Sequence, residues 1–438
     1  MILLVREINN YRLLNLIKNR FIEVIQINLV LEKIMINNNK HHIDEKIKLL
    51  LKYFNNGNNG EAEKLAVSLT DEFPDNQFAW KILGALWWKK NKNFDALNAM
   101  QTAIRLSPND ASAYYNLGIA LKESDRLKES EEAYRKALEL KYDYPEANNN
   151  LGVVLQGMGR TNEAINSFKR ELEYNPTYAG AFWNLSGCEK NIKDAEHWIN
   201  KCLEVDANHI KAKLTKAALS YYQGKRDSFM NLAESEFRNH SFMRSFSWVF
   251  NLPQLPEIHF NIWYFFDSII KKSINKRPFY EFGVWRGSSF KYLIKTFKKG
   301  YGFDTFTGLP EDWIVGNNLE KAGTYSSDGN IPKIDGGIFI QGNFENTLPV
   351  FFSEKRPKAS IINFDADLYS STICALNYSK QVMDKDTILV FDEFLMNDSW
   401  EQDEFKALNE FCSHNSYNYE VLAVSFFTKQ VAVKLLGI

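Results

Sequence analysis

Along the first half of the chain, hydrophobic and small residues recur at a fixed spacing. The pairs Leu83-Gly84, Leu117-Gly118 and Leu151-Gly152 follow one another at intervals of 34 residues. A glycine at the same place in each period allows two helices to touch. The apolar face that one helical hairpin leaves uncovered is covered by the next hairpin. The pattern therefore predicts a stacked array of helical hairpins.

The positions between these pairs agree with the same period. Large and small residues stand where such a repeat needs them, namely at Trp80, Trp87, Ala96, Ala103, Pro108, Tyr134, Ala137, Ala164, Phe168 and Pro176. At these residues the chain resembles the tetratricopeptide repeat family, which implies an all-α superhelix that binds rather than catalyses. We expect the repeat domain over residues 43–240, after a helical or flexible extension over 1–42.

The first helix of each hairpin is expected to line the groove of such an array. Equivalent positions of four repeats carry aromatic, amide and cationic side chains, namely Lys81 and Trp88, Tyr115 and Lys122, Asn149 and Gln156, and Trp183 and Lys190. This lining suits a protein, peptide or glycan partner, and an ordinary solvated concave face is an equally weighted alternative. Ala85 and Glu146 stand where a clamp for C-terminal carboxylates needs polar or basic groups, which disfavours chaperone tails.

From Arg277 the pattern changes to short apolar runs separated by helical stretches. The runs are FYEFGV, YGFD, GIFIQG, IINFD and TILVFD, and two β-rich runs over 419–427 and 430–435 follow them. This alternation predicts an α/β domain over 277–438 with a doubly wound parallel sheet and a terminal hairpin. The segment over 241–276 is expected to be a linker with a joining helix over 258–272.

The first of these strands ends in a glycine-containing turn before a helical pattern. Glycines let a backbone approach a ligand, and a helix N-terminus offers free N–H groups. An acidic residue two positions before the first glycine suits the cationic methionyl end of S-adenosylmethionine (SAM), whereas a dinucleotide fingerprint needs GxGxxG. The residues expected to bind SAM here are Glu281, Gly283, Trp285, Gly287, Ser288 and Ser289.

Two further strand ends carry residues that suit the rest of the same ligand. Asp304 ends the second strand, where an acidic side chain can hydrogen-bond both ribose hydroxyls. A simple turn aspartate is the alternative for this position. Gln341, Gly342 and Asn343 end the third strand, beside the expected adenine.

Four carboxylates follow the fourth and fifth strands: Asp365, Asp367, Asp392 and Glu393. Strand ends converge on one crevice in such a sheet, and unpaired, desolvated carboxylates would repel one another there. A divalent cation relieves that repulsion, and carboxylate ligands suit Mg²⁺ or Mn²⁺ better than zinc. The alternative is that one or two of the acids cap helices, as Asp367 could.

The motifs of the second half, taken in order, resemble the macrocin O-methyltransferase (TylF/MycF-like) family. They are EFGVWRGSS, YGFDTFTGLPEDW, GNFENTLP, FDADLYSSTICAL and VFDEF. The resemblance implies a Rossmann-like class I methyltransferase and a SAM-dependent, metal-assisted methyl transfer to a hydroxyl, commonly of a sugar. It assigns Asp365, Asp392 and Glu393 to the metal and Asp367 to the reacting proton. Glu393 departs from the family's paired Asp, and Lys385-Asp386 replaces its usual Gly-Gly.

Charge and composition exclude several other classes. The 53 Lys and Arg residues nearly balance the 54 Asp and Glu residues, so no global positive field favours nucleic acid. No apolar run is long enough to cross a membrane and no signal peptide is recognised, so a cytoplasmic location is expected. His414 is the one histidine after Arg277, which disfavours a histidine base.

Together these features predict a cytoplasmic SAM-dependent O-methyltransferase. Its acceptor is expected to be a sugar or another small molecule with a hydroxyl, and its repeats are expected to recruit substrate or partner. The alternative is an inactive repeat scaffold that keeps the methyltransferase fold. An NAD-dependent oxidoreductase is disfavoured because the third glycine of its fingerprint is missing.

Overall fold

The computed structural model describes residues 40–90, 92–316 and 318–438. These residues form two compact units that divide between Pro176 and Thr177. The predicted extension over 1–42 lies outside the described residues except for its last three, where the first helix begins. The predicted domain boundaries near residues 240 and 276 stay predictions, because the two units reflect packing and not sequence family.

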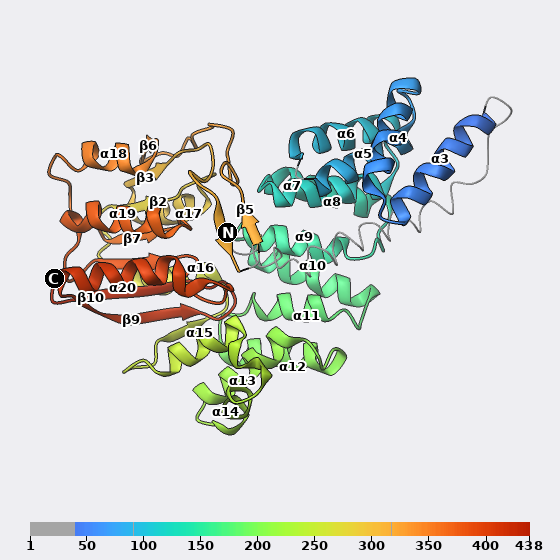
Figure 1. The fold of residues 1–438 in the computed structure, drawn as a ribbon. Coiled ribbons are helices and arrows are strands. Elements are labelled where there is room, and N and C mark those ends of the chain that lie inside the picture. Colours follow the sequence, from blue (N-terminus) through green and yellow to red (C-terminus); the bar gives the residue numbers. More distant parts are fainter. Residues whose placement is uncertain (1–39, 91, 317) are drawn as a thin grey trace. The chain divides into compact units, whose positions relative to one another are not determined.

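The unit before Thr177 consists of antiparallel helices, drawn from blue to green in Figure 1. They are α3 (Lys40–Asn55), α4 (Asn59–Glu72), α5 (Gln77–Lys89), α6 (Asn93–Leu106), α7 (Ala111–Glu123), α8 (Leu127–Leu140), α9 (Ala147–Gly157) and α10 (Thr161–Tyr174). Helix α5 packs against α6, α7 against α8 and α9 against α10. The predicted array of helical hairpins is confirmed over these residues.

The recurring glycines mark the places where the two helices of a hairpin come closest. A Cβ atom at Gly118 would lie 2.8 Å from the Tyr134 ring, and one at Gly152 would lie 2.6 Å from the Phe168 ring. Both rings are fully buried, so they have no open space into which they could move. Glycine therefore recurs every 34 residues because, at this position of each hairpin, a side chain would clash with the second helix.

The unit from Thr177 onward begins with helices. They are α11 (Ala179–Ser186), α12 (Ile192–Val205), α13 (Ile210–Tyr222), α14 (Asp227–Ala233), the 3₁₀ helix η2 (Glu236–Asn239) and α15 (Ser241–Phe250). Helix α11 packs against α12, and α12 packs against α13. The hairpin pattern of the first unit thus continues for one more pair before the chain enters a sheet.

One large sheet organises the rest of this unit. The ten strands are β1 (Glu257–His259), β2 (Phe279–Phe282), β3 (Gly300–Asp304), β4 (Trp313–Val315), β5 (Asn318–Glu320), β6 (Gly337–Gln341), β7 (Ile361–Phe364), β8 (Ile388–Phe391), β9 (Asn418–Ser425) and β10 (Val431–Leu436). Eight of them pair in the order β1-β9-β10-β8-β7-β2-β3-β6, and β4 pairs with β5 separately. Strand β10 is antiparallel to both neighbours, and the other pairs of the sheet are parallel.

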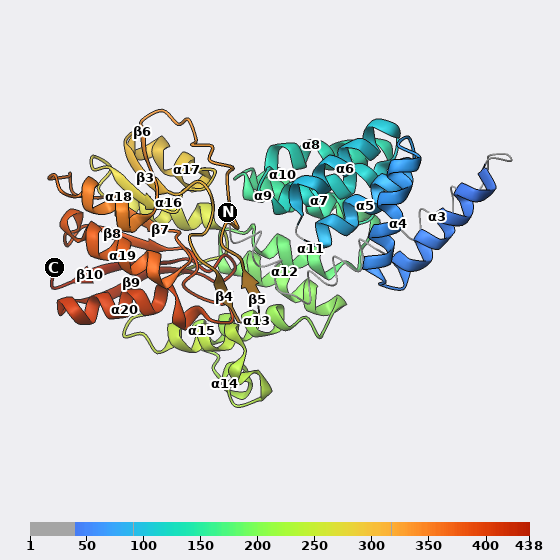
Figure 2. The same ribbon diagram turned by 45° about the horizontal axis from the view of Figure 1, so that its top comes forward.

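Helices cover both faces of this sheet (Figures 1 and 2). They are α16 (Ile262–Lys272), α17 (Ser288–Phe297), α18 (Phe344–Phe351), α19 (Tyr369–Ser379) and α20 (Glu404–Asn415), with short 3₁₀ helices η3 (Lys380–Val382) and η4 (Trp400–Gln402). Residues of α16 and α17 share one buried cluster with residues of the strands. Helices α18, α19 and α20 lie side by side on the other face. The predicted α/β architecture is confirmed as a mixed sheet.

The segment over 241–276 belongs to the unit from Thr177 onward. The predicted helix over 258–272 begins at Ile262, because the Asn261 side chain accepts hydrogen bonds from the backbone N–H groups of Trp263 and Tyr264. Strand β1 precedes it and pairs with β9. Residues of α15, β1 and α16 thus pack within this unit, and the boundaries of a linker over 241–276 stay a prediction.

The tip of the β9–β10 hairpin, residues 426–430, contacts the helices that start this unit. A Cβ atom at Gly187 of α11's C-terminus would lie 2.4 Å from the Phe427 ring. The ring of Phe246 in α15 lies 4.6 Å from that of Phe426. Helix α15 also holds the loop after β8, since the Ser245 hydroxyl accepts a hydrogen bond from Met396 N–H at 2.8 Å. These helices and the sheet thus share one core.

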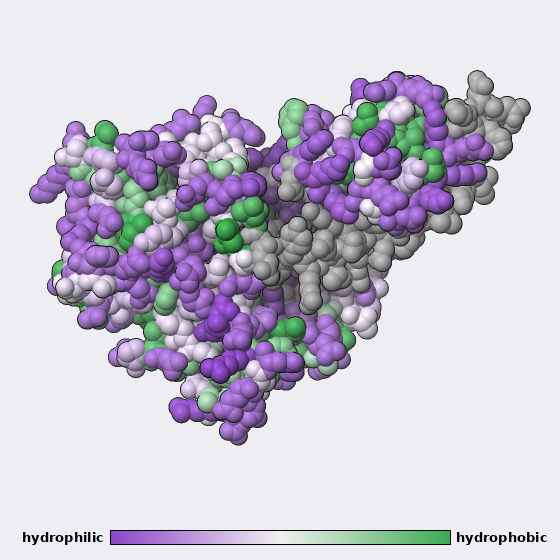
Figure 3. Space-filling model, in the orientation of Figure 1, coloured by the Kyte–Doolittle hydropathy of each residue, from purple (hydrophilic) through white to green (hydrophobic). Residues whose placement is uncertain are grey.

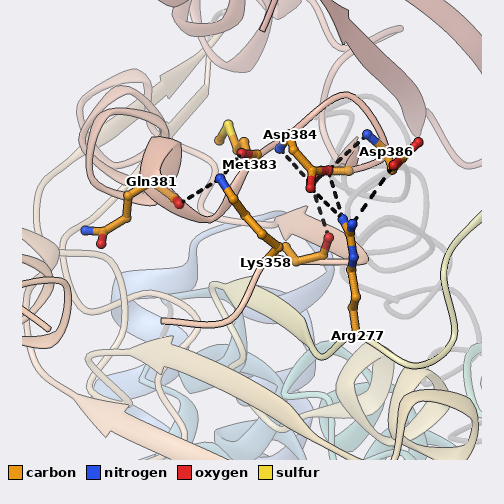
Figure 4. A network of polar contacts seen from close by, with 8 residues as sticks. Arg277, Lys358, Gln381, Met383, Asp384 and Asp386 are labelled. Atoms are coloured by element: carbon orange, nitrogen blue, oxygen red, sulfur yellow. Dashed lines mark hydrogen bonds and ion pairs between the residues drawn. The ribbon is translucent and has the colours of Figure 1, made fainter. Parts of the chain in front are cut away.

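A polar network fastens the amino ends of β2, β7 and β8 (Figure 4). Arg277 donates to both carboxylate oxygens of Asp384 at 2.8 and 2.9 Å, and its guanidinium lies 4.0 Å from Asp386. Lys358 donates to the carbonyls of Gln381 and Met383. Asp386 therefore belongs to a network at the end of the sheet opposite the predicted site.

The surface gives little sign of a large apolar patch on the face drawn in Figure 3. Over the described residues that face is mainly hydrophilic, and hydrophobic residues form small separate patches. Exposed large hydrophobic residues such as Phe94, Ile314 and Val350 come from distant parts of the sequence. Among the described residues, no helix has both the length and the apolar character needed to cross a membrane.

Candidate functional site

A row of phenylalanines sets the register of the candidate site. Phe303, Phe282, Phe364 and Phe391 come from β3, β2, β7 and β8 and are directly paired across the sheet. Their rings stack with centroids 4.9, 5.5 and 4.9 Å apart. Because all four strands are parallel, the residues that follow these phenylalanines lie together at the carboxyl edge. Those residues are Asp304, Gly283, Asp365 and Asp392.

The glycine-containing turn after β2 is closely packed at this edge. Gly283 has φ +89°, and a Cβ atom there would lie 1.8 Å from the carbonyl oxygen of Asp365. Only glycine fits this approach of two strand ends. Trp285 also has positive φ, and its buried indole donates a hydrogen bond to the Ser326 carbonyl at 3.2 Å. Gly287 precedes α17 with φ +75°, and Ser288 and Ser289 open that helix.

Glu281 is fully buried on β2 beneath this turn. Its Oε1 accepts a hydrogen bond from the Ser289 hydroxyl at 2.7 Å, whereas the buried Oε2 has no hydrogen-bond partner among the described residues. Burial raises the pKa of Glu281 to about 8, although the Ser289 hydrogen bond acts in the opposite direction. A buried polar atom without a partner costs free energy, so this oxygen suits a ligand's donor.

Asp304 accepts hydrogen bonds from the backbone of two turns, which agrees with the alternative of a turn aspartate. Its Oδ2 accepts hydrogen bonds from the backbone N–H groups of Val284 and Trp285 at 2.8 and 2.7 Å. Its Oδ1 accepts one from Phe306 N–H at 2.6 Å. Burial raises the pKa of Asp304, and these backbone hydrogen bonds lower it. Both oxygens thus hold the glycine-containing turn, and the expected contact with ribose stays a prediction.

The end of β6 lies beside Asp304. The N–H of Gly342 donates to the Asp304 carbonyl at 2.9 Å, and Gly342 has φ +133°. The side chains of Gln341 and Asn343 are exposed, and Asn343 directly precedes α18. These three residues therefore stand at the same edge of the sheet as the glycine-containing turn.

Asp365 and Asp367 follow β7, and both side chains are buried. Asp367 has φ +65°, an uncommon backbone conformation for a residue other than glycine. Burial is the main cause of the raised pKa of Asp403 and Glu404, and the negative charge of Asp367 raises both pKa values further. Asp367 is therefore close enough to the acids at the start of α20 to interact with them electrostatically.

Asp392 and Glu393 follow β8 and contact the β9–β10 hairpin. Asp392 Oδ1 accepts a hydrogen bond from the Gln430 amide at 2.6 Å. Glu393 Oε2 lies 3.2 Å from the ammonium of Lys429, and both of these side chains are buried. Asn397 donates a further hydrogen bond to Glu393 at 3.3 Å. Two consecutive residues of the hairpin thus reach two consecutive acids.

Sequence reasoning missed four residues of this region: Asp403, Glu404, Lys429 and Gln430. Glu404 Oε2 accepts a hydrogen bond from Glu393 N–H at 2.9 Å, and burial holds its pKa well above the ordinary value. Burial also raises the pKa of Asp403 to about 7. None of these residues belongs to a local motif, because tertiary packing alone brings them to the ends of β7 and β8.

These donors do not fit a divalent cation. In the part of the chain that the structure describes, no three His, Cys, Asp or Glu side chains are placed so that they could hold a metal ion. Glu393 faces the Lys429 ammonium, which would repel a divalent cation, and Asp392 accepts from Gln430. The expected ligand set of Asp365, Asp392 and Glu393 is therefore not assembled, because hairpin side chains contact two of its members.

The expected groove lining of the repeats is mostly buried. Lys81 is 4% exposed, and its ammonium lies 2.7 Å from Asp110. Lys122 is 1% exposed and pairs with Glu123 at 3.3 Å. Buried side chains are also found at Tyr115, Asn149, Gln156 and, in the second unit, Trp183, whereas Trp88 is half-buried and Lys190 is exposed. Two of the three lysines predicted to meet a partner, Lys81 and Lys122, therefore make intramolecular ion pairs.

Comparisons with known proteins identify the repeats. A family model described as TPR repeat matches residues 88–125, and one described as tetratricopeptide repeat matches 111–144 and 145–178. The chain therefore contains tetratricopeptide repeats over these residues. No curated protein matches the chain.

Solved structures with some likeness to the chain include PilW, PilF and YrrB. PilW, a type IV pilus biogenesis factor, is 21% identical to this chain, with a TM-score of 0.40. The match covers 45% of this chain and 96% of PilW. PilF of Pseudomonas aeruginosa is 20% identical, with a TM-score of 0.39 and coverages of 43% and 90%. YrrB, described as a TPR protein with an unusual peptide-binding site, is 20% identical, with a TM-score of 0.36 and coverages of 41% and 90%.

Proposed function

We propose that the α/β part of the chain is a SAM-dependent O-methyltransferase. The observation that carries this proposal is the buried carboxylate of Glu281, whose Oε2 has no hydrogen-bond partner among the described residues. It lies beneath a glycine-containing turn at the amino end of α17. The cationic amino group of SAM is a donor that would satisfy this oxygen, and it would also favour the ionised carboxylate.

The arrangement of the sheet supports the same proposal. Helices lie on both faces, and the glycine-containing turn follows β2, beyond which the strand order changes direction. Ligands of open α/β sheets bind outside the carboxyl ends of the strands at such a point. The strand order with an antiparallel β10 also agrees with the class I methyltransferase fold that the sequence resemblance implies. Fold alone does not define function, so the proposal rests on Glu281 and the turn.

The residues at this edge suit the chemistry of methyl transfer. SAM, when bound, supplies a methyl group on a positively charged sulfur. Glu281 would hold the amino group of the methionyl end, and Asp304 would keep the glycine-containing turn in the conformation that the ligand meets. Asp367 would accept the proton that the acceptor hydroxyl loses as its oxygen takes the methyl group. The main contribution of the chain is therefore alignment and proton transfer.

The acceptor is proposed to be a small molecule with a hydroxyl group, and a sugar is the class that the family resemblance favours. The repeats are proposed to recruit this substrate or a protein partner. Helices α11 and α15, which belong to the same unit as the sheet, contact the β9–β10 hairpin beside the candidate site. A shorter chain without residues 40–176 is expected to raise KM for a recruited substrate more than it lowers kcat.

Calorimetry with SAM and with NAD tests the proposal directly. Wild-type protein is expected to bind SAM and not NAD, and Glu281→Gln should weaken SAM binding by about tenfold or more, the effect of one charged hydrogen bond. Glu354→Gln, at an exposed site, is the matched control and should bind like wild type.

Equal affinity of wild type and Glu281→Gln for SAM, or tighter binding of NAD, would contradict the assignment. Binding of SAM without transfer to any of a panel of hydroxyl acceptors would favour an inactive scaffold. Methyl transfer from labelled SAM, measured at saturating acceptor concentration, distinguishes an active methyltransferase from an inactive scaffold that binds SAM.

A further inference from the structure

Lys429 places a positive charge inside the acidic end of the sheet. Its side chain is 4% exposed and its partner Glu393 is 1% exposed. The ammonium lies 3.2 Å from Oε2 and 3.5 Å from Oε1 of that carboxylate. A buried charge of either sign is costly unless a partner and hydrogen bonds compensate it. The pair is thus a built feature of this site and not a surface contact.

The backbone around Lys429 is constrained so that its side chain points inward. Lys429 has φ +71°, and its N–H donates to the Ser425 carbonyl at 3.2 Å. The Thr428 hydroxyl lies 2.6 Å from that of Ser425, and Ser425 N–H donates to the Gln430 carbonyl. Phe426 and Phe427 on the preceding positions are buried. The turn therefore holds the lysine in place before any ligand binds.

The acids that Lys429 faces are connected to one another. Glu404 is fully buried, and its Oε2 accepts a hydrogen bond from the backbone N–H of Glu393 at 2.9 Å. The neighbouring Gln430 donates to Asp392. Lys429 and Gln430 thus supply a charge and a hydrogen-bond donor to two of the three acids that the family resemblance assigns to a metal.

We propose that the Lys429 ammonium takes the place of a divalent cation in this site, so that methyl transfer by this protein needs no metal. The claim that methyl transfer needs no metal rests on the proposed function. The claim that Lys429 occupies the place of a cation does not. In this role Lys429 is a positioning residue, because it acts through Glu393 and the acids beside it. Its charge offsets part of the repulsion among these acids.

Titration with Mn²⁺, followed by the EPR signal of the free ion, tests the charge proposal on the full chain. Wild type is compared with the double variant Glu393→Gln/Lys429→Met, which removes both charges of the pair, and with Lys355→Met at an exposed lysine. The proposal predicts equal Mn²⁺ uptake by all three proteins. Greater uptake by wild type than by the double variant would overturn it.

The single variant Lys429→Met leaves the acids without this cation. It is expected to bind Mn²⁺ at least about tenfold more tightly than wild type does, because a buried carboxylate without its partner charge attracts another cation. Lys429→Arg keeps the charge and should behave as wild type does. The proposal is overturned if Lys429→Met takes up no more Mn²⁺ than Lys429→Arg does. If Lys429→Met does not fold, the comparison of wild type with the double variant decides the question.

The activity arm uses excess EDTA. Wild type is expected to keep its full rate of methyl transfer, and a rate that falls in EDTA and returns with Mg²⁺ would overturn the proposal. Lys429→Arg should recover at least half of the rate that Lys429→Met loses, as expected when the charge itself is required. If no protein transfers methyl, the proposed function fails, while the Mn²⁺ titration still decides the charge proposal.

Discussion

The indole ring of Trp183 in α11 lies 5.1 Å, centroid to centroid, from the phenyl ring of Phe427 in the β9–β10 hairpin. Both side chains are buried. Trp183 occupies a position where the repeat pattern predicts a groove residue, yet it packs in the core of the unit from Thr177 onward. Two residues after Phe427, the same hairpin places Lys429 beside Glu393.

Gly187→Ala tests this contact. A methyl group at residue 187 would come within 2.4 Å of the Phe427 ring, so the ring or helix α11 must move. We expect a loss of about 1–3 kcal/mol in the free energy of unfolding, as for other overpacked cores. Urea unfolding followed by tryptophan fluorescence measures it. Gly60→Ala, which would meet nothing within 4 Å, is the control and should not destabilise the protein.

Glu281→Gln should change how stability depends on pH. Burial raises the pKa of Glu281 from 4.5 to about 8, so the native state keeps this proton when the unfolded chain has lost it. The stability of wild type therefore falls as pH rises from about 5 to about 8. The variant has no such proton, and its melting temperature should fall less over this interval. If the melting temperatures of the two proteins fall by the same amount between these pH values, the carboxyl of Glu281 is not buried and neutral.

Asp304→Asn separates a role in the backbone from direct ligand contact. The amide nitrogen of Asn cannot accept, so at least one of the hydrogen bonds from Val284, Trp285 or Phe306 is lost. We expect a loss of about 1–3 kcal/mol in stability without any ligand. The control is Asp335→Asn at an exposed site. Unchanged thermal stability together with weaker SAM binding would instead indicate direct contact with the ligand.

Lys81→Ala and Lys64→Ala compare a buried and an exposed ion pair of the repeats. The ammonium-to-carboxylate distances are similar, 2.7 Å to Asp110 and 2.9 Å to Glu61, but the side chains of Lys81 and Lys64 are 4% and 76% exposed. Loss of Lys81 leaves Asp110 without its buried partner charge, which should cost about 3 kcal/mol or more. Loss of Lys64 should cost less than about 1 kcal/mol. Equal effects in urea unfolding would show that Lys81 is not structurally important.

Two fragments test where the second unit begins. The fragment over 177–438 keeps the contacts of α11 and α15 with the hairpin, whereas a fragment over 277–438 exposes Phe426, Phe427 and Trp400. We expect the longer fragment to be monodisperse and cooperative in unfolding, and the shorter one to aggregate or to bind a hydrophobic dye. A stable, dye-free short fragment would support the boundary near residue 276 that the sequence predicts.

The sequence could predict what periodicity encodes. Gly118 and Gly152 recur at equal spacing because each must contact a large ring, and the runs before Asp365 and Asp392 are apolar because both faces of the sheet are covered. It left two roles open for Asp304, since ribose and backbone N–H groups suit the same carboxylate, and only the tertiary structure shows the three N–H groups that it accepts from. It could not predict the Lys429–Glu393 pair, because those residues are distant in sequence and no local pattern relates them.

Strand β10 lies between β8 and β9 and not at the edge of the sheet. Its insertion has a consequence for synthesis on the ribosome. The hairpins before Thr177 contact mainly their neighbours, so they can fold in the order in which they emerge. In the sheet, in contrast, one edge of β8 lacks its neighbouring strand until residues 431–436 have been synthesised. Lys429 can reach Glu393 only when that pairing forms. The acidic end of the sheet therefore depends for this internal charge on a strand pairing that is distant in sequence, and such pairings form more slowly than local contacts.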